Sequence, residues 1–121
     1  MRIDLHCHTK KCKQGDSPNR NAEPKHFKSV IESAQVDIVA ITNHNIFDLK
    51  QFNRFCEELS ETERLWPGVE LDVCSSREKS HWHMLVITSP SKKERFNSAL
   101  KQLLGNTSPD EVLVSVKDVF D

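Results

Sequence analysis

The sequence predicts a single mixed α/β domain over residues 1–121, with a largely parallel sheet. Three observations support this. Short β-rich segments alternate with amphipathic helical ones, which is typical of parallel α/β layers and barrels. Residues 36–42 form a nearly continuous apolar run, as expected of a strand buried on both faces. Polar, histidine-bearing segments follow the strands, and in such folds functional groups gather at the carboxyl ends of strands.

The first half of the chain contains two strand–helix pairs. Residues 2–8 are expected to form a strand and the polar residues 16–21 a loop. A helix is expected over residues 23–35, because its apolar residues recur at i, i+3, i+4 and i+7. They are Phe27, Val30, Ile31 and Ala34. The buried strand 36–42 follows, and then a second helix over residues 48–59. Its apolar stripe consists of Leu49, Phe52, Phe55, Cys56 and Leu59.

The second half adds a predicted hairpin and a third helix. Residues 67–74 and 81–88 are expected to be strands, and the short polar segment 75–80 between them can close a hairpin. A helix is expected over residues 91–104 and stops at Gly105, a common residue at helix C-termini.

The last segment is predicted to form a fourth helix. It starts with an N-cap, a first-turn proline and a capping box, supplied by Ser108, Pro109, Asp110 and Glu111. One helical stripe then continues through Val112, Leu113, Val116, Val119 and Phe120.

The composition argues against several classes of protein. The net charge of −1 disfavours a protein that coats DNA through excess positive charge. No apolar run approaches the roughly 20 residues that cross a bilayer, and the N-terminus has no apolar signal core. We therefore expect a cytoplasmic protein without membrane contact. The four cysteines form no CxxC pair, so we expect free thiols rather than a structural zinc site.

Two histidines at the end of the first strand form a candidate ligand pair. His6 and His8 flank Cys7, and they share one face with Asp4 because side chains alternate along a strand. Two imidazoles on one face can chelate a single metal ion. This pattern favours a ligand pair over two unrelated polar residues.

Two other candidates are ambiguous when each is considered alone. His44 follows the buried strand directly, where barrel enzymes keep catalytic groups, yet a lone histidine there is more often an ordinary polar residue. Glu70 lies between Val69 and Leu71, where a carboxylate is costly to bury unless it is paired or metal-bound. For Glu70 alone, the stronger interpretation is an edge strand on which Glu70 and Asp72 face solvent.

The predicted hairpin changes the context of Glu70. His81 and His83 repeat the His-x-His pattern on its second strand. Pairing across the hairpin places Glu70 and Asp72 opposite roughly Leu85 and His83, respectively. A carboxylate is therefore expected within reach of an imidazole.

The histidines are distributed unevenly along the chain. Five of the six fall in three clusters at strand ends, and the sixth, His26, is expected on a helix surface. Imidazole and carboxylate ligands without thiolates suit Zn, Mn or Fe. A bridging carboxylate could hold two or three ions, and such a site activates water and clamps the oxygens in phosphoryl transfer.

Four short motifs occur in order over residues 1–88. They are residues 4–9 (Asp-Leu-His-Cys-His-Thr), 41–45 (Ile-Thr-Asn-His-Asn), 67–70 (Pro-Gly-Val-Glu) and 83–86 (His-Met-Leu-Val). This set resembles the PHP (polymerase and histidinol phosphatase) family. The first motif of that family is DxHxH followed by Thr or Ser, and its second is usually Thr-Asp-His-Asn. A glutamate motif and a His-led strand follow.

The resemblance implies a distorted (β/α)7 TIM-like barrel with a trinuclear metal site at the strand carboxyl ends. About four strands and three to four helices of that barrel would be present. The implied metal ligands, with Glu70 as the bridge, are His6, His8, His44, Glu70 and His83. Asp16 matches an acidic ligand that often follows the first motif. His81 is implied as a reserve ligand or a substrate contact.

The sequence departs from the family pattern at two points. Asn43 stands where the family usually has Asp, and an amide supplies no charge and no general base. We expect Asn43 to lie behind the ligands, or the metal set to be altered. The family's last motifs are absent, and seven strands do not fit in 121 residues. We therefore expect a domain that is incomplete on its C-terminal side and is completed by the remainder of the barrel. Proteins with this front end are often fused to polymerase or ATPase regions.

The leading hypothesis is a metal-dependent phosphoesterase or nuclease, in which a His/Glu metal cluster activates water for phosphoester hydrolysis. The substrate would be a phosphate ester such as a nucleotide or a nucleic acid. Arg20, Lys10 and Lys11 either grip its phosphate or serve only solubility. The alternative is a catalytically inactive metal-binding scaffold module of a larger nucleic-acid-processing or ATPase protein. A third hypothesis is an unrelated small α/β protein that binds no stoichiometric metal.

Overall fold

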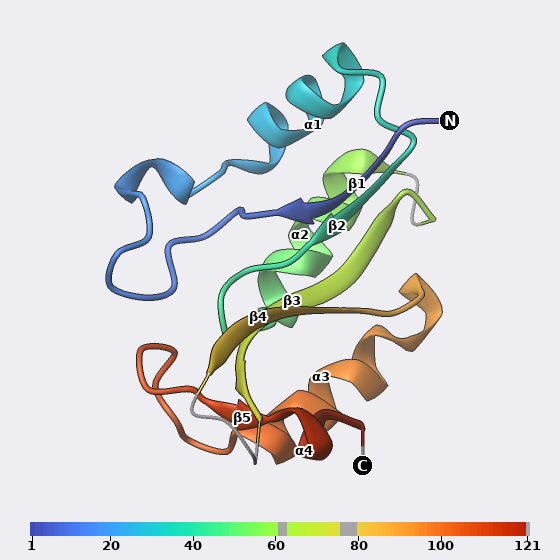
Figure 1. Ribbon diagram of the computed structural model, residues 1–121. Coiled ribbons are helices and arrows are strands. Elements are labelled where there is room, and N and C mark those ends of the chain that lie inside the picture. Colours follow the sequence, from blue (N-terminus) through green and yellow to red (C-terminus); the bar gives the residue numbers. More distant parts are fainter. Residues whose placement is uncertain (61–62, 76–79, 121) are drawn as a thin grey trace.

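The computed structural model describes residues 1–60, 63–75 and 80–120, which form a mixed α/β fold (Figure 1). The described strands are β1 (Ile3–Cys7), β2 (Ile38–Ile41), β3 (Leu65–Cys74), β4 (His81–Ile87) and β5 (Val114–Ser115). They form one mostly parallel sheet in the order β1-β2-β3-β4, with β5 paired to β3. Only β4 is antiparallel to its neighbour. The described strands leave this sheet open, with β1 and β4 at its two ends.

The helices connect the strands largely as the sequence predicts. They are α1 (Pro24–Ser33), α2 (Leu49–Leu59), α3 (Lys93–Leu104) and the short α4 (Val116–Phe120). The Asp48 side chain caps α2 by accepting a hydrogen bond from the Gln51 N–H at 2.9 Å. Gly105 ends α3 with a φ of 57°, a left-handed conformation that glycine adopts without strain. None of the helices in the described part of the chain has the length and hydropathy to span a bilayer.

Strand β3 separates the hydrophobic core from the polar face of the sheet. Val69, Leu71 and Val73 are almost completely buried and belong to the core that α1, α2 and α3 cover. Because side chains alternate along a strand, Glu70 and Asp72 point to the opposite face. The edge-strand interpretation of Glu70 is therefore wrong, since β3 has neighbours on both sides. Burial of the apolar face thus fixes the direction in which Glu70 points.

The predicted hairpin is confirmed, and its register is the predicted one. In the β3–β4 pair, Glu70 lies opposite Leu85 and Asp72 lies opposite His83. The predicted connection over residues 75–80 falls mostly on residues 76–79, which lie outside the described residues.

The predicted helix over residues 108–120 is wrong in its first half. Ser108 to Glu111 form a turn, closed by a hydrogen bond of 2.9 Å from the Glu111 N–H to the Ser108 carbonyl. Strand β5 follows, and only residues 116–120 are helical. The reason is tertiary, because β2 covers β3 only at residues 65–67 and β5 pairs with the uncovered edge at residues 73–74. Pairing with this open edge outweighs the local capping signal.

Two neighbouring side chains test this corrected segment. Val112 is buried, at 4% exposure, whereas Leu113 is 45% exposed, although the predicted helix placed both on one apolar stripe. We predict that Val112→Ala lowers the free energy of unfolding by about 2 kcal/mol, because it removes buried methyl groups. The control Leu113→Ala should cost less than about 1 kcal/mol. Equal losses in urea unfolding would contradict the observed turn and strand.

Candidate metal centre

The carboxylate of Glu70 is the centre of a histidine cluster. Only 4% of its side chain is exposed. Three imidazole nitrogens approach its Oε2 atom: Nε2 of His6 at 2.9 Å, of His8 at 3.1 Å and of His44 at 2.9 Å. Nδ1 of His83 lies 2.8 Å from its Oε1 atom. We call these five residues the Glu70 cluster.

The topology of the sheet brings the four histidines together from three separate segments. His6 lies on β1 and His8 directly follows that strand. His44 follows β2, which ends at the same edge of the sheet as β1 because the two strands are parallel (Figure 1). His83 comes from β4, where it pairs with Asp72, two residue pairs along the hairpin from the Glu70–Leu85 pair. The cluster is therefore a product of tertiary structure, since its members span residues 6 to 83.

The backbone after β2 fixes His44 beside Glu70. The Glu70 N–H donates to the Asn43 carbonyl at 3.0 Å, and the Asn45 N–H donates to the Glu70 carbonyl at 2.8 Å. These two bonds form an isolated parallel bridge between His44 and Glu70. The pairing of β2 with β3 thus continues past the regular strand, and it holds the imidazole against the carboxylate.

Hydrogen bonds alone account poorly for the contacts between these imidazoles and carboxylates. Both nitrogens of His44 face carboxylates, with Nδ1 2.6 Å from Asp16 Oδ1 and Nε2 2.9 Å from Glu70 Oε2. His83 likewise faces Glu70 through Nδ1 and Asp72 Oδ1 through Nε2, the latter at 3.0 Å. A neutral imidazole carries a single N–H, so satisfying every contact would require two imidazolium rings 5.6 Å apart. The Arg20 guanidinium is a further donor close to this ring, 3.3 Å from His44 Nδ1.

The donor set of the Glu70 cluster could hold a divalent cation. Nitrogen or oxygen ligands about 2.0–2.1 Å from a tetrahedral ion lie roughly 3.3 Å from one another. The separations of 2.8–3.1 Å around Glu70 are close to this value. Two groups of atoms converge, His6–His8–Glu70 and His44–Glu70–His83, and the atoms of each lie within 4.8 Å of one another. They share Glu70, which is where a bridging carboxylate would lie.

The protonation of His8 and Glu70 also suits metal binding. Burial, followed by the nearby Arg20 and His44, lowers the pKa of His8 to about 4. His8 is therefore neutral at pH 7 and has a lone pair for a ligand bond. Burial alone would raise the pKa of Glu70, but the hydrogen bond from His6 and the nearby His44 hold it below its ordinary value. A neutral imidazole thus adjoins an ionised carboxylate.

Asp16 lies against the back of His44 and is not part of either convergent group. Its Oδ1 contacts His44 Nδ1, and its Oδ2 accepts from the N–H groups of Cys12 at 2.9 Å and Lys13 at 3.1 Å. The Arg20 guanidinium contacts Oδ1 at 3.0 Å. In this geometry Asp16 orients His44 and the loop, as carboxylates behind metal-binding histidines commonly do. The resemblance had implied a direct ligand.

The side chain of Asn43 forms its hydrogen bonds with the loop after β1 and with α2 rather than with the Glu70 cluster. Its Oδ1 accepts from the N–H groups of Thr9 at 2.8 Å and Lys10 at 3.1 Å. Its Nδ2 donates to Thr9 Oγ1 at 3.2 Å and Gln51 Oε1 at 3.3 Å. An aspartate could accept at this position but could not donate to Gln51. Asn43 therefore fastens the start of the loop after β1.

The other site residues predicted from the sequence differ in how they relate to the Glu70 cluster. Arg20 reaches it through its contacts with Asp16 and His44. Lys10 forms an ion pair with Asp48 at 2.8 Å, at the start of α2, and Lys11 is exposed. His81 is exposed at the start of β4 and belongs to neither convergent group.

Three residues beside the cluster were not singled out as site residues by the sequence. Asp72 Oδ2 accepts from Lys13 Nζ at 2.6 Å and from Asn45 Nδ2 at 2.8 Å. The Asp72 N–H also donates to Asn45 Oδ1 at 2.8 Å. Strand alternation already placed Asp72 on the face of Glu70, so a signal for it existed. Lys13 lies in a loop, where no periodicity indicates its partner.

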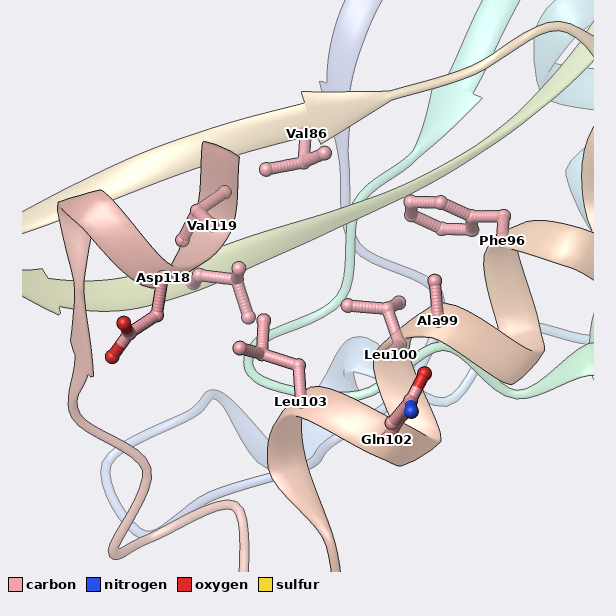
Figure 2. A pocket seen from close by; sticks show the side chains of 9 residues that line it. Val86, Phe96, Ala99, Leu100, Gln102, Leu103, Asp118 and Val119 are labelled. Atoms are coloured by element: carbon pink, nitrogen blue, oxygen red, sulfur yellow. The ribbon is translucent and has the colours of Figure 1, made fainter. Parts of the chain in front are cut away.

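A hollow of about 460 Å³ lies elsewhere, between β3, β4, α3 and α4 (Figure 2). Its lining is mainly apolar, and Figure 2 shows Phe96, Leu100 and Val119 turned toward it, with Asp118 at one side. The lining includes no histidine and none of the candidate site residues. The convergent polar groups and this hollow are therefore separate features.

No protein-family model matches the chain, and it has no significant match among curated proteins or solved structures.

Asp16 provides a test of the geometry behind His44. Burial would raise its pKa, but hydrogen bonds from Cys12, Lys13 and His44 outweigh burial and lower the pKa from 3.8 to about 2. The folded state thus favours the ionised form. This stabilisation, about 2 kcal/mol, is complete above pH 4 and is lost as the pH falls toward 2.

We predict that Asp16→Asn lowers the free energy of unfolding at pH 6 and that its deficit relative to the wild type narrows between pH 4 and pH 2. Urea unfolding of the chelator-treated protein across this range measures the effect. Asp118→Asn, which changes an exposed carboxylate on α4, is the control. A deficit that stays constant with pH would contradict the role of the ionised Asp16.

Proposed function

We propose that this chain is the front part of a PHP-type domain that hydrolyses phosphoesters with the help of divalent metal ions. The observation that carries the proposal is the convergence of His6, His8, His44 and His83 on the buried Glu70. The resemblance to the PHP motifs marked these same five residues as ligands. These five residues converge from four segments of the chain, namely three that carry the histidines and β3, which carries Glu70. This convergence supports the proposal independently of the motif pattern.

The proposed roles follow from the contacts. His6, His8 and Glu70 would hold one ion, and His44, His83 and the same glutamate a second. Zn, Mn or Fe suits these ligands, with up to three ions in a complete site. Such ions supply Lewis-acid stabilisation of phosphoryl oxygens and activation of water.

Arg20 is the proposed phosphate contact nearest the cluster. Its guanidinium lies beside His44 and can form paired hydrogen bonds with a phosphate, in exchange for its contact with Asp16. Lys11 is exposed and available for the same purpose. Lys10 would first have to leave its ion pair with Asp48.

The proposal also covers the rest of the barrel, the cellular location and the fused regions. We propose that further strands complete a distorted TIM-like barrel beside β1. In support, β1 has only one neighbour in the described sheet, and its Ile3 and Leu5 are 53% and 43% exposed. The proposed cytoplasmic location rests on the lack of a long apolar run in the sequence. A fused ATPase or polymerase region and a nucleotide or nucleic-acid substrate rest on the motif resemblance alone.

A scaffold without catalysis is the second candidate, and Asn43 favours it. The family's aspartate is replaced here by an amide whose donors and acceptor are used to hold the loop after β1. No general base remains at that position. In this alternative the ions would fasten β1, β2, β3 and β4 together through the Glu70 cluster.

Metal content of the purified chain tests the site. We predict one or more Mn, Zn or Fe ions per chain by elemental analysis, and their loss in the double variant His6→Ala/His8→Ala. The matched control is His26→Ala, because His26 is exposed on α1 and contacts none of the cluster. The wild-type chain remaining free of metal after loading would contradict both the enzyme and the scaffold.

Turnover of the metal-loaded chain separates the two candidates. An enzyme should hydrolyse phosphomonoester or phosphodiester substrates, and activity should fall to background in the double variant but not in His26→Ala. Stoichiometric metal without hydrolysis would favour the scaffold.

A further inference from the structure

Asp72 lies next to the Glu70 cluster without belonging to either convergent group. It shares a face of β3 with Glu70, two residues away, and lies opposite His83 in the hairpin. The His83 ring spans the two carboxylates, with Nδ1 2.8 Å from Glu70 Oε1 and Nε2 3.0 Å from Asp72 Oδ1. The hairpin register thus holds this imidazole between two acceptors.

Asp72 is itself held firmly. Lys13 Nζ and Asn45 Nδ2 both donate to its Oδ2 atom, at 2.6 Å and 2.8 Å, which leaves Oδ1 for His83. The Asp72 side chain is 19% exposed, whereas that of His83 is 56% exposed. The carboxylate is therefore fixed by its surroundings, and the imidazole has few packing contacts to fix it.

We propose that Asp72 is a positioning residue that keeps the proton of His83 on Nε2 and aims the Nδ1 lone pair at the ion beside Glu70. The inference rests on the proposed function, because it assigns Asp72 a role toward the metal. Carboxylates behind histidine ligands fix the tautomer and the ring orientation and raise the basicity of the ligand nitrogen. The role is indirect, since Asp72 acts through His83.

The two histidines of the second group then bind through different nitrogens. Asp16 occupies Nδ1 of His44 and leaves Nε2 facing Glu70. Asp72 occupies Nε2 of His83 and leaves Nδ1 facing Glu70. The positions of the two carboxylates therefore select Nε2 in one ring and Nδ1 in the other.

A purely structural role for Asp72 makes a different prediction. Asp72 could serve only as the partner of Lys13, fastening the loop after β1 to β3. In that case Lys13→Met would weaken metal binding as much as Asp72→Ala. If Asp72 acts through His83, Lys13→Met should weaken zinc binding much less than Asp72→Ala, because Asn45 still donates to the carboxylate.

The test is the zinc affinity of the intact chain, measured by competition with a chromogenic chelator. We predict that Asp72→Ala weakens binding by about 10- to 100-fold, the usual effect of removing a carboxylate behind a histidine ligand. Asp72→Asn keeps an oxygen acceptor and should recover part of the loss. The double variant Asp72→Ala/His83→Ala should bind no more weakly than His83→Ala, because Asp72 has no route to the ion once the ring is gone.

Ring nitrogen NMR of the zinc-loaded protein gives a second readout. His83 should carry its proton on Nε2 in the wild type, and that signal should be lost or exchange-broadened in Asp72→Ala. A proton on Nδ1 of His83, an Asp72→Ala affinity equal to wild type, or additive losses in the double variant would overturn the inference and leave the proposed function standing. A wild-type chain that binds no zinc would overturn the proposed function and this inference together.

Discussion

Burial of the Glu70 carboxylate is the constraint on which the site depends. A buried carboxylate is tolerated only when it is paired or bound to metal, because loss of its hydration costs several kcal/mol. The chain meets this constraint with four imidazoles from β1, the segment after β2, and β4. The parallel order of β1, β2 and β3 brings these segments to one edge, and the core beneath β3 keeps Glu70 on the opposite face.

Around this centre, a second layer of contacts connects the loops to the sheet. Asp16 ties the loop after β1 to His44, and Asp72 ties it to β3 through Lys13. Asn45 contacts both Asp72 and the Pro109 carbonyl, so the turn before β5 is fastened to the same region. The order of these loops and the orientation of His44 and Asp72 therefore depend on the same hydrogen bonds.

Periodicity and turn chemistry in the sequence predicted much of this fold. The apolar alternation of residues 67–74 and the polar break after them predicted the hairpin and the partners of Glu70 and Asp72. The interpretation of Glu70 taken alone, as a solvent-facing residue on an edge strand, was wrong, because nothing local shows that β3 has a strand on each side. Strand β5 was missed because an open edge of β3 competes with a strong capping signal. The loop contacts of Asp16 and Lys13 depend on three-dimensional closure, which spacing alone does not specify.

X-ray absorption spectroscopy at the metal edge of the zinc-loaded chain tests the central claim most directly. If zinc binds at the Glu70 cluster, the spectrum should show nitrogen and oxygen neighbours at about 2.0–2.1 Å and the outer-shell scattering of several imidazole rings. A sulfur shell at about 2.3 Å would place the ion on cysteines instead. Such a shell, or oxygen neighbours without imidazole scattering, would contradict the assignment of this cluster as a metal centre.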